Sequence, residues 1–365
     1  MRTTRLVAPL AGVSLVLAGC GGSPEAAPTA PTAATAAPRA SSSTKGAKAY
    51  PVTIENCGYQ QTFERKPSRV VILNGTSVGE VESFLTLDLG DTILANAQSY
   101  GVSDDPTMVK RIKALPTRGM QKMGRVQDIP AEQLMAMKPD LVVSTWTGGF
   151  DPKRGFATRE ELHGAGIRTL VNPVNCGYGK TNPTAAEKKA RDGAGVESTF
   201  AFLQLLGTVF DKPEAANQAV RTMRKDIAAV QKAVQGRPRP KALIAFPGMS
   251  MMNANGLPAV MAGGIYDDVL AKAGTVNAFA GKGRRLTSSL SKEQLAAADV
   301  DILVIGGFTP DEDLDAEARK LFAAYPQWSA SKNQRYVKVS DGVYLGPNNR
   351  LAVRKIAEKA HPDAF

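Results

Sequence analysis

Glu132-Gln133-Leu134, five further residues and Asp140-Leu141-Val142-Val143 form a pattern that the chain uses twice. The second copy is Glu293-Gln294-Leu295, again five residues, and then Asp301-Ile302-Leu303-Val304. Each copy predicts a short helix, a turn and a buried strand. The repetition therefore predicts two similarly built lobes, each with one surface glutamate at the same place. Matched carboxylates on two lobes are typical of a protein that docks on a two-fold partner.

Strands and helices alternate outward from both copies of this pattern. In the first half, strands are expected at residues 70–73, 92–95, 141–144 and 167–171, and helices at 79–89, 131–137 and 159–165. In the second half, strands are expected at 242–246 and 336–339, helices at 265–273, 316–324 and 350–360, and a helix and a strand within 291–305. This alternation predicts an α/β protein whose mostly parallel sheets are covered on both faces.

One long helix interrupts the alternation over residues 211–235. Asp211 is a suitable N-cap, and Pro213 falls in the first turn, where a missing N–H costs nothing. Apolar residues recur in steps of four and three along one face, at Ala216, Val220, Met223, Ile227, Val230 and Val234. A coiled-coil seam is the alternative, but the stripe is short for that. We expect a rigid strut between an N-terminal lobe, 50–210, and a C-terminal lobe, 236–365.

The N-terminus predicts export. Arg2 and Arg5 precede an apolar run that ends in small residues before Cys20, as in a signal peptide spanning residues 1–20. Cys20 resembles the lipobox cysteine of bacterial lipoproteins, which receives a diacylglyceryl group; an ordinary signal peptide with a chance cysteine is the alternative. Residues 21–49, rich in Pro, Ala, Thr and Ser, predict a flexible tether. We expect an extracytoplasmic protein with a lipid anchor in the cell membrane.

Cys57 and Cys176 remain once Cys20 is assigned, and they stand in matching Asn-Cys-Gly-Tyr contexts. Two thiols in an exported protein favour one disulfide. Paired metal ligands are the alternative, although no histidine lies near either cysteine in the sequence.

The net charge excludes some partners. The chain carries +11, of which five basic residues and one acidic residue lie in 1–49, leaving +7 for the rest. The basic residues are scattered without interleaved aromatic residues, so nucleic acid is a poor candidate. An anionic ligand or anionic lipid headgroups are compatible with this charge. After the signal peptide, no apolar run is long enough to cross a bilayer.

The residues for catalysis are sparse. Gly75-Thr76-Ser77-Val78-Gly79 fits the nucleophile elbow of serine hydrolases, but the only histidines are His163 and His361. Two histidines far apart exclude a three-histidine metal site, and no phosphate-binding loop is present. A secreted hydrolase that uses Ser77 is kept as the alternative of another class. We expect a binding protein that is not an enzyme and uses no cofactor.

Ligands of open α/β sheets bind beyond the carboxyl ends of the strands. Those ends supply the candidates Asn74, Tyr100, Trp146, Met249, Met252 and Tyr344, with Phe308 as a further one. Arg284, beside Arg285 in a Gly-rich loop, and Arg159 are candidate donors to ligand oxygens. Simpler alternatives stay open: Trp146 fills the rim of its own lobe, the methionines fill the core, Arg284 is solvated, and Arg159 merely begins a helix.

The chain resembles the substrate-binding lipoproteins of iron-siderophore and cobalamin ABC importers. The resemblance runs from Tyr50 nearly to the end, and its order and spacing are specific. It rests on Lys66-Pro67-Ser68-Arg69-Val70-Val71, the helix reaching Leu89-Gly90, Glu132-Gln133-Leu134 with Lys138-Pro139-Asp140-Leu141-Val142, the long helix, Leu270 to Asn277, Ser291 to Leu295 and His361-Pro362. The Asn-Cys-Gly start and Ala157-Thr158-Arg159-Glu160 further resemble the Gram-positive, actinobacterial siderophore branch.

This resemblance implies a class III periplasmic-binding fold, in which one helix joins the lobes and the ligand lies in a shallow cleft. It implies a monomer that captures a ferric siderophore, chelates no iron itself and delivers the ligand to an ABC permease dimer. Glu132 and Glu293 match the family's positions that pair with permease arginines; decoration of a helix first turn is the alternative for each. The same scaffold carrying cobalamin or haem is the alternative ligand assignment.

Overall fold

The two copies of the repeated pattern occupy equivalent places in two different sheets. The computed structural model describes residues 50–120 and 129–365. Asp140 N–H donates to the carbonyl of Arg69 at 3.0 Å, and Asp301 N–H donates to that of Lys241 at 2.8 Å. Each carboxylate bonds back: Asp140 accepts from Ser68 N–H and Asp301 from Lys241 N–H, both at 2.8 Å. In each copy, the aspartate thus joins the start of its own strand to the start of the neighbouring strand in the same sheet.

The first sheet consists of parallel strands in the order β4-β3-β5-β6. Its strands are β3 (Val70–Ile72), β4 (Ile93–Asn96), β5 (Leu141–Ser144) and β6 (Arg168–Val171). The helices connected to it are α1 (Val78–Thr86), α2 (Pro106–Lys113), α3 (Ala131–Ala136) and α4 (Arg159–Gly164). An antiparallel hairpin of β1 (Val52–Asn56) and β2 (Tyr59–Phe63) precedes this sheet.

The second sheet has the order β11-β10-β7-β8, and β9 also pairs with β7. Its strands are β7 (Lys241–Phe246), β8 (Ala259–Met261), β9 (Val276–Asn277), β10 (Ile302–Gly306) and β11 (Tyr336–Val339). All pairings are parallel except that of β7 with β8. The helices of this half are α8 (Ile265–Lys272), α9 (Leu286–Ser289), α10 (Lys292–Ala296), α11 (Leu314–Ala324), α12 (Ser329–Lys332) and α13 (Asn349–Ala360).

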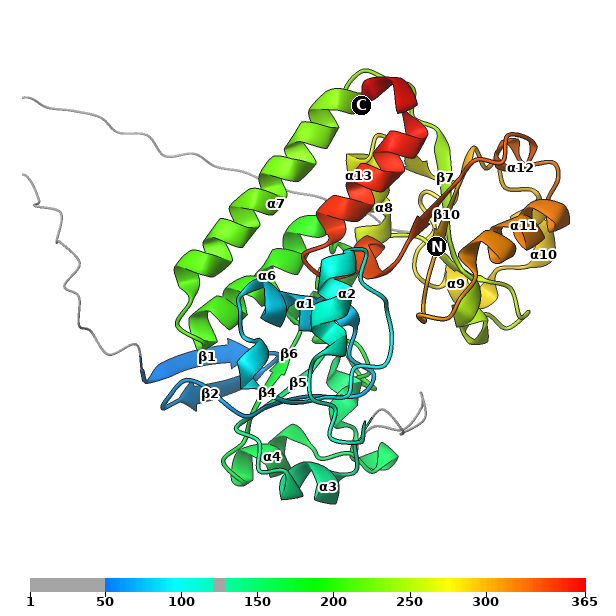
Figure 1. Cartoon of the computed structure of the whole chain (residues 1–365). Helices are drawn as coiled ribbons and strands as arrows, with labels where there is room; N and C mark the ends of the chain where they lie inside the picture. Colours follow the sequence, from blue (N-terminus) through cyan, green and yellow to red (C-terminus); the bar gives the residue numbers. More distant parts are fainter. Residues whose placement is uncertain (1–49, 121–128) are drawn as a thin grey trace, which may run out of the picture. The chain divides into compact units, whose positions relative to one another are not determined.

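Three helices connect the two sheets: α5 (Ala185–Asp192), α6 (Val196–Val209) and the long α7 (Pro213–Val234). All six predicted stripe residues of α7 are buried, and α7 packs against α6 and α13 (Figure 1). The predicted N-cap was wrong. Asp211 has a left-handed backbone, with φ of 53°, and Lys212 occupies the cap position. The Lys212 ammonium group instead donates to the carbonyl of Leu87 at 2.7 Å.

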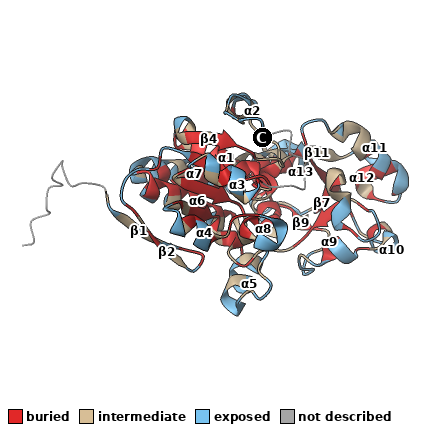
Figure 2. Cartoon of the chain, turned by 90° about the horizontal axis from the view of Figure 1, so that it is seen from below, coloured by how far each residue is buried: buried red, intermediate tan, exposed pale blue. Residues whose placement is uncertain are grey.

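Alternating strand residues give each sheet two buried faces. Val70 and Ile72 of β3 and Ile244 of β7 belong to one continuous buried cluster, which also contains the α7 stripe. Val71 packs in a second cluster with Leu134 of α3, and Leu243 packs in a third with Leu295 of α10. Figure 2 shows buried residues along the strands and exposed ones on helices such as α5 and α10. The predicted α/β fold with mostly parallel sheets covered on both faces is confirmed.

Some predictions concern features that the structure leaves untested. The signal peptide, Cys20 and the tether lie outside the described residues. The division into lobes at 50–210 and 236–365 stays a prediction, whereas the helix between them is present. Among the described residues, no helix has the length and apolar character that a membrane span requires.

Candidate functional site

Trp146 lies just after β5, where the backbone of Gly148 and Gly179 packs closely against its indole. A Cβ atom at Gly148 would come within 2.3 Å of the Trp146 ring, and one at Gly179 within 2.7 Å. The indole packs against Tyr178, with ring centroids 5.0 Å apart, and both rings are half-buried. The predicted strand-end residue thus forms part of an aromatic surface, as ligand-binding sites commonly do.

Two arginines continue this surface into the second half of the chain. The Arg191 guanidinium of α5 lies 4.1 Å from the Tyr178 ring centroid, a cation–π arrangement. Arg284, from the loop before α9, donates through Nη2 to the carbonyl of Arg191 at 3.4 Å. Its guanidinium lies 5.8 Å from the ring centroid of Tyr266 in α8.

Tyr344, which follows β11, links this surface back to the first sheet. Its ring stacks on Tyr266 at 5.9 Å, and its hydroxyl accepts a hydrogen bond of 3.0 Å from Asn175 Nδ2. Burial raises the pKa of Tyr344 to about 12, so the hydroxyl stays protonated and can also donate. We call Trp146, Tyr178, Arg191, Arg284, Tyr266 and Tyr344 the aromatic–arginine cluster.

A hollow of about 610 Å³ lies beside the two arginines of the cluster. This volume is within the range of roughly 300–1,000 Å³ that small-molecule sites occupy. Its lining consists of Arg191, Asp192, Gly263, Gly264, Gly283, Arg284, Arg285 and Ser288. The cluster and the hollow together form the candidate ligand site.

Buried polar side chains at the start of α1 lie near Tyr344. The Glu80 carboxylate accepts from Thr145 Oγ1 at 2.5 Å and from Asn172 Nδ2 at 2.6 Å. Burial raises the pKa of Glu80 to about 7, and these two hydrogen bonds oppose the rise. The charge of Glu80 in turn contributes to the raised pKa of Tyr344. Glu80 therefore changes protonation near neutral pH within reach of the site.

Further carboxyl groups join α1 and α2 to the segment after β11. Asp104 accepts from the backbone N–H groups of Ser340 and Gly342 at 3.0 and 3.2 Å, and from Lys355 Nζ at 2.7 Å. Asn348 Nδ2 donates to Glu82 at 2.6 Å. These bonds connect residues more than two hundred positions apart in the chain: Asp104 ties the loop before α2 to the segment after β11 and to α13, and Glu82 ties α1 to the residue that precedes α13.

Of the predicted ligand residues, Tyr100 and Asn74 lie close to the cluster. Tyr100 stacks on Phe308 at 5.8 Å, and burial raises its pKa well above the usual value, with a contribution from Tyr344. Asn74 is buried and accepts from Gly75 N–H at 2.8 Å. A Cβ at Gly75 would be 3.6 Å from Trp146 Nε1.

The two methionines differ from each other. Met249 is half-buried and packs against the continuous core cluster, whereas Met252 is 41% exposed, beside Met251 at 70%. Among the described residues, no ring contact or hydrogen bond joins either methionine to the aromatic–arginine cluster, so their ligand role stays a prediction.

Arg159 lies apart from the cluster and is 2% exposed. Its guanidinium donates to Asn56 O at 2.9 Å and to Thr169 Oγ1 at 2.8 Å, and it lies 4.1 Å from the Tyr59 ring centroid. Arg159 thus fastens the β1–β2 hairpin to β6. With its donors occupied in this way, we leave it out of the ligand site.

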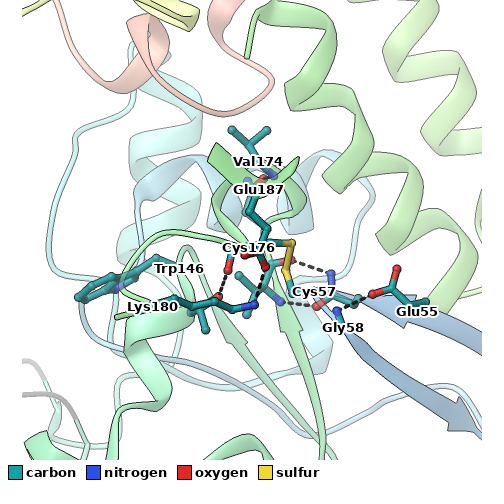
Figure 3. The surroundings of a disulfide bond; sticks show 12 residues. Glu55, Cys57, Gly58, Trp146, Val174, Cys176, Lys180 and Glu187 are labelled. Atoms are coloured by element: carbon teal, nitrogen blue, oxygen red, sulfur yellow. Dashed lines mark hydrogen bonds and ion pairs between the residues drawn. A yellow bond between two sulfur atoms is a disulfide. The ribbon is translucent and has the colours of Figure 1, made fainter. Parts of the chain in front are cut away.

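The predicted disulfide between Cys57 and Cys176 is present, with Cα atoms 5.0 Å apart (Figure 3). It ties the hairpin to the loop that carries Asn175 and Tyr178. Thr147 Oγ1 donates to the carbonyl of Cys176 at 2.6 Å, so the same loop is also held to the segment after Trp146.

Ser77 does not have the surroundings of a catalytic nucleophile. Its hydroxyl caps α1 by accepting from Gly79 N–H at 3.1 Å, and it also bonds to the buried Asp341 carboxyl group. The histidines lie elsewhere: His163 contacts Gln61 and His361 contacts the carbonyl of Gly274. Among the described residues, no group of three His, Cys, Asp or Glu side chains is placed to hold a metal ion.

Glu132 and Glu293 occupy the same position of their helices, the second residue after the cap of α3 and of α10. Both are exposed. In the part of the chain that the structure describes, neither has a salt-bridge partner. Both side chains thus lie exposed on the protein surface.

Comparison with known proteins agrees with this architecture. The sequence pattern of the family described as "Periplasmic binding protein" matches residues 70–338. The chain belongs to this periplasmic binding protein family. Its members are substrate-binding proteins of transport systems and not enzymes. Proteins similar to the chain include the vitamin B12-binding protein of Salmonella typhi, 26% identical over 61% of this chain and 71% of its own.

Solved structures of periplasmic binding proteins share the fold. A periplasmic binding protein from Veillonella parvula superposes with a TM-score of 0.65 at 18% identity, covering 85% of this chain and 97% of its own. An Fe³⁺-hydroxamate transport protein from Saccharomonospora viridis gives 0.62 at 21% identity, covering 85% and 99%. A heme-binding protein from Roseiflexus gives 0.54 at 18% identity, covering 82% and 100%. At these identities the likeness shows the fold.

Three residues predicted from the sequence, Trp146, Arg284 and Tyr344, thus lie together in the cluster. Its other three members, Tyr178, Arg191 and Tyr266, were not predicted from the sequence. Tyr178 stood in the Asn-Cys-Gly-Tyr repeat, which signalled only the disulfide. Arg191 and Tyr266 lie on helices whose patterns look like ordinary amphipathic surface. Only the packing of α5 and α8 brings them to the site.

Proposed function

We propose that the chain is the substrate-binding component of an ABC importer, which captures a ferric siderophore and delivers it to a permease. The aromatic–arginine cluster is the observation that carries this proposal. Aromatic faces suit an organic chelate, and guanidinium groups suit its oxygen atoms. The cluster draws on residues after β5 and β6 and on residues of the second half, as a ligand held between two sheets requires.

Cobalamin is the second candidate ligand, because the curated relatives at 26% identity bind vitamin B12. Haem is the third, since some structural neighbours are heme-binding proteins. The siderophore takes precedence here because the sequence features beyond the common fold, including Asn56-Cys57-Gly58, resemble the siderophore branch.

Delivery depends on Glu132 and Glu293, which we propose as the two docking residues. Replacing both by alanine is expected to reduce uptake of the ferric siderophore by roughly tenfold or more. Each change removes an exposed carboxylate that would form a charge-assisted contact with an arginine. The assay is accumulation of radioactive iron by cells whose own copy of the gene is deleted and replaced by the variant.

Ligand affinity of the purified double variant should equal that of the unaltered chain, because neither glutamate belongs to the aromatic–arginine cluster and both are exposed side chains on α3 and α10. Glu64→Ala with Glu214→Ala, two exposed glutamates outside these helices, is the matched control. Normal uptake by the Glu132→Ala, Glu293→Ala variant would refute the docking role.

We also propose that Cys20 carries the lipid anchor and that residues 21–49 form the tether. When whole cells are extracted with a detergent that separates into two phases, Cys20→Ser should then shift the protein from the detergent phase to the aqueous phase. Retention in the detergent phase would contradict the anchor.

A further inference from the structure

The hollow beside the cluster has an unusual balance of charge. Arg191, Arg284 and Arg285 line it, and Asp192 is the acidic residue in its lining. Glycines form much of the remaining wall. A Cβ at Gly264, where φ is 55°, would lie 3.4 Å from Arg284 Nη2 and from the Arg191 carbonyl oxygen. The absence of a side chain at this position thus leaves the arginines close to the backbone and open to the hollow.

Neither Arg191 nor Arg284 is neutralised by the protein. Across residues 50–120 and 129–365, no carboxylate lies within salt-bridge distance of either guanidinium. The Nε atoms of both side chains are buried and have no hydrogen-bond acceptor there. Buried donors are nearly always paired in folded proteins, so this pair of arginines lacks acceptors that it would normally have.

The rings beside the arginines restrict where they can move. Arg191 lies over Tyr178 and Arg284 over Tyr266, and the single hydrogen bond between them goes to a backbone carbonyl. Both arginines line the same hollow, and like charges repel one another. An anion in the hollow would remove the repulsion and provide the missing acceptors.

We propose that this site selects siderophores whose ferric complex is anionic, such as catecholates, over neutral or cationic hydroxamates. The inference rests on the proposed function and names its ligand class. Catecholate groups are dianions, so three of them leave the ferric complex strongly negative. Three hydroxamate groups are monoanions and only neutralise the metal. Catecholate rings also offer faces to Trp146 and Tyr178, and their oxygens offer acceptors to the arginines.

The test is a fluorescence titration of the full-length lipidated chain in detergent micelles. The probes are ferric enterobactin as the anionic complex, ferrichrome as the neutral one and ferrioxamine B as the cationic one. We expect ferric enterobactin to bind at least roughly tenfold more tightly than either hydroxamate. Its affinity should fall as salt is raised, because screening weakens attraction between charges.

Arg191→Gln with Arg284→Gln is expected to weaken binding of ferric enterobactin by roughly a hundredfold, about tenfold for each charge-assisted contact. The same variant should change ferrichrome affinity little. Arg221→Gln, at an exposed arginine of α7 bonded to Gln218, is the matched control and should behave like the unaltered chain. An unchanged thermal unfolding midpoint shows that each variant is folded.

The outcomes separate this inference from the proposed function. Ferrichrome or ferrioxamine B binding as tightly as ferric enterobactin would overturn the anionic selectivity and leave the siderophore function intact. Haemin binding through the same arginines, with no response to any ferric siderophore, would support the anionic site and overturn the siderophore assignment. Binding of ferric enterobactin that survives Arg191→Gln with Arg284→Gln would overturn the role given to the arginines.

Discussion

Glu82 shows at the scale of one residue how the buried carboxyl groups affect the whole protein. It is 2% exposed, and it accepts from Asn348 Nδ2. Burial raises its pKa to about 8, and the negative charges of Asp341 and Asp104 add to the rise. Among the described residues, no cation forms a salt bridge with Glu82, whereas Asp104 forms one with Lys355. Ionised Glu82 is thus unfavourable in the folded state.

The raised pKa of Glu82 predicts a pH-dependent stability. The folded state holds the proton more tightly than the unfolded chain, so the stabilisation is complete below about pH 4.5 and is lost as the pH rises towards 8. Glu80 and Asp341, whose pKa values burial raises to about 7, act in the same direction. Glu82→Gln should therefore lose less unfolding free energy between about pH 5 and pH 8 than the unaltered chain, by on the order of 3 kcal/mol.

Denaturant unfolding at a series of pH values measures this effect. Glutamine keeps an oxygen for Asn348 but cannot ionise, so folding itself should be preserved. Glu64→Gln, at an exposed carboxylate, is the control and should leave the pH profile unchanged. Parallel pH profiles for Glu82→Gln and the unaltered chain would show that Glu82 is not the titrating group.

At the scale of elements, the disulfide connects the hairpin to the loop of the candidate site. Replacing Cys57 and Cys176 by serine is expected to lower the free energy of unfolding by about 2–5 kcal/mol, because it frees a long loop in the unfolded chain. Ligand affinity should fall too, since Asn175 and Tyr178 lie on the same loop.

Denaturant unfolding and ligand titration of oxidised and reduced protein provide the measurement. The unaltered chain kept reduced with dithiothreitol should match the double serine variant in both properties. Equal stability of the oxidised chain and the variant would mean that the hairpin and the loop are held by their other contacts alone.

The elements differ in how far the sequence predicted them. The repeated pattern and the α7 stripe were predictable, because periodic burial on one face leaves a periodic sequence. The β1–β2 hairpin was not predicted, because its apolar residues Val52 and Ile54 are only half-buried and its buried positions include the polar Asn56 and Gln61. The prediction for Arg159 suffered because the hairpin was not foreseen. An arginine at the start of a helix looks exposed in the sequence, but the hairpin encloses its guanidinium group in the structure.

The candidate site was predictable only in part for a related physical reason. Trp146 and Tyr344 follow strands, and the carboxyl ends of strands are where ligands bind. Arg191 of α5 joins the site through its cation–π contact with Tyr178, and Tyr266 of α8 joins it by stacking on Tyr344. Such contacts depend on tertiary packing and leave no period in the sequence.

Across the whole molecule, the candidate ligand site and the proposed docking residues are separate. The aromatic–arginine cluster brings together residues of both halves, from Trp146 to Tyr344, while Glu132 and Glu293 repeat once in each half. This arrangement suits a receptor that holds its cargo between the halves and presents the same carboxylate twice to a permease dimer.

A tryptophan fluorescence titration of the full-length chain with ferric and iron-free siderophores, cyanocobalamin and haemin tests the proposed siderophore binding most directly. Trp146 packs on Tyr178 in the site, whereas Trp328 is buried in another core cluster, so Trp146→Phe identifies the reporting residue. We expect saturable quenching by a ferric siderophore, weaker binding of its iron-free form and loss of the signal in Trp146→Phe. Saturable binding of cyanocobalamin or haemin, with no response to any ferric siderophore, would contradict it.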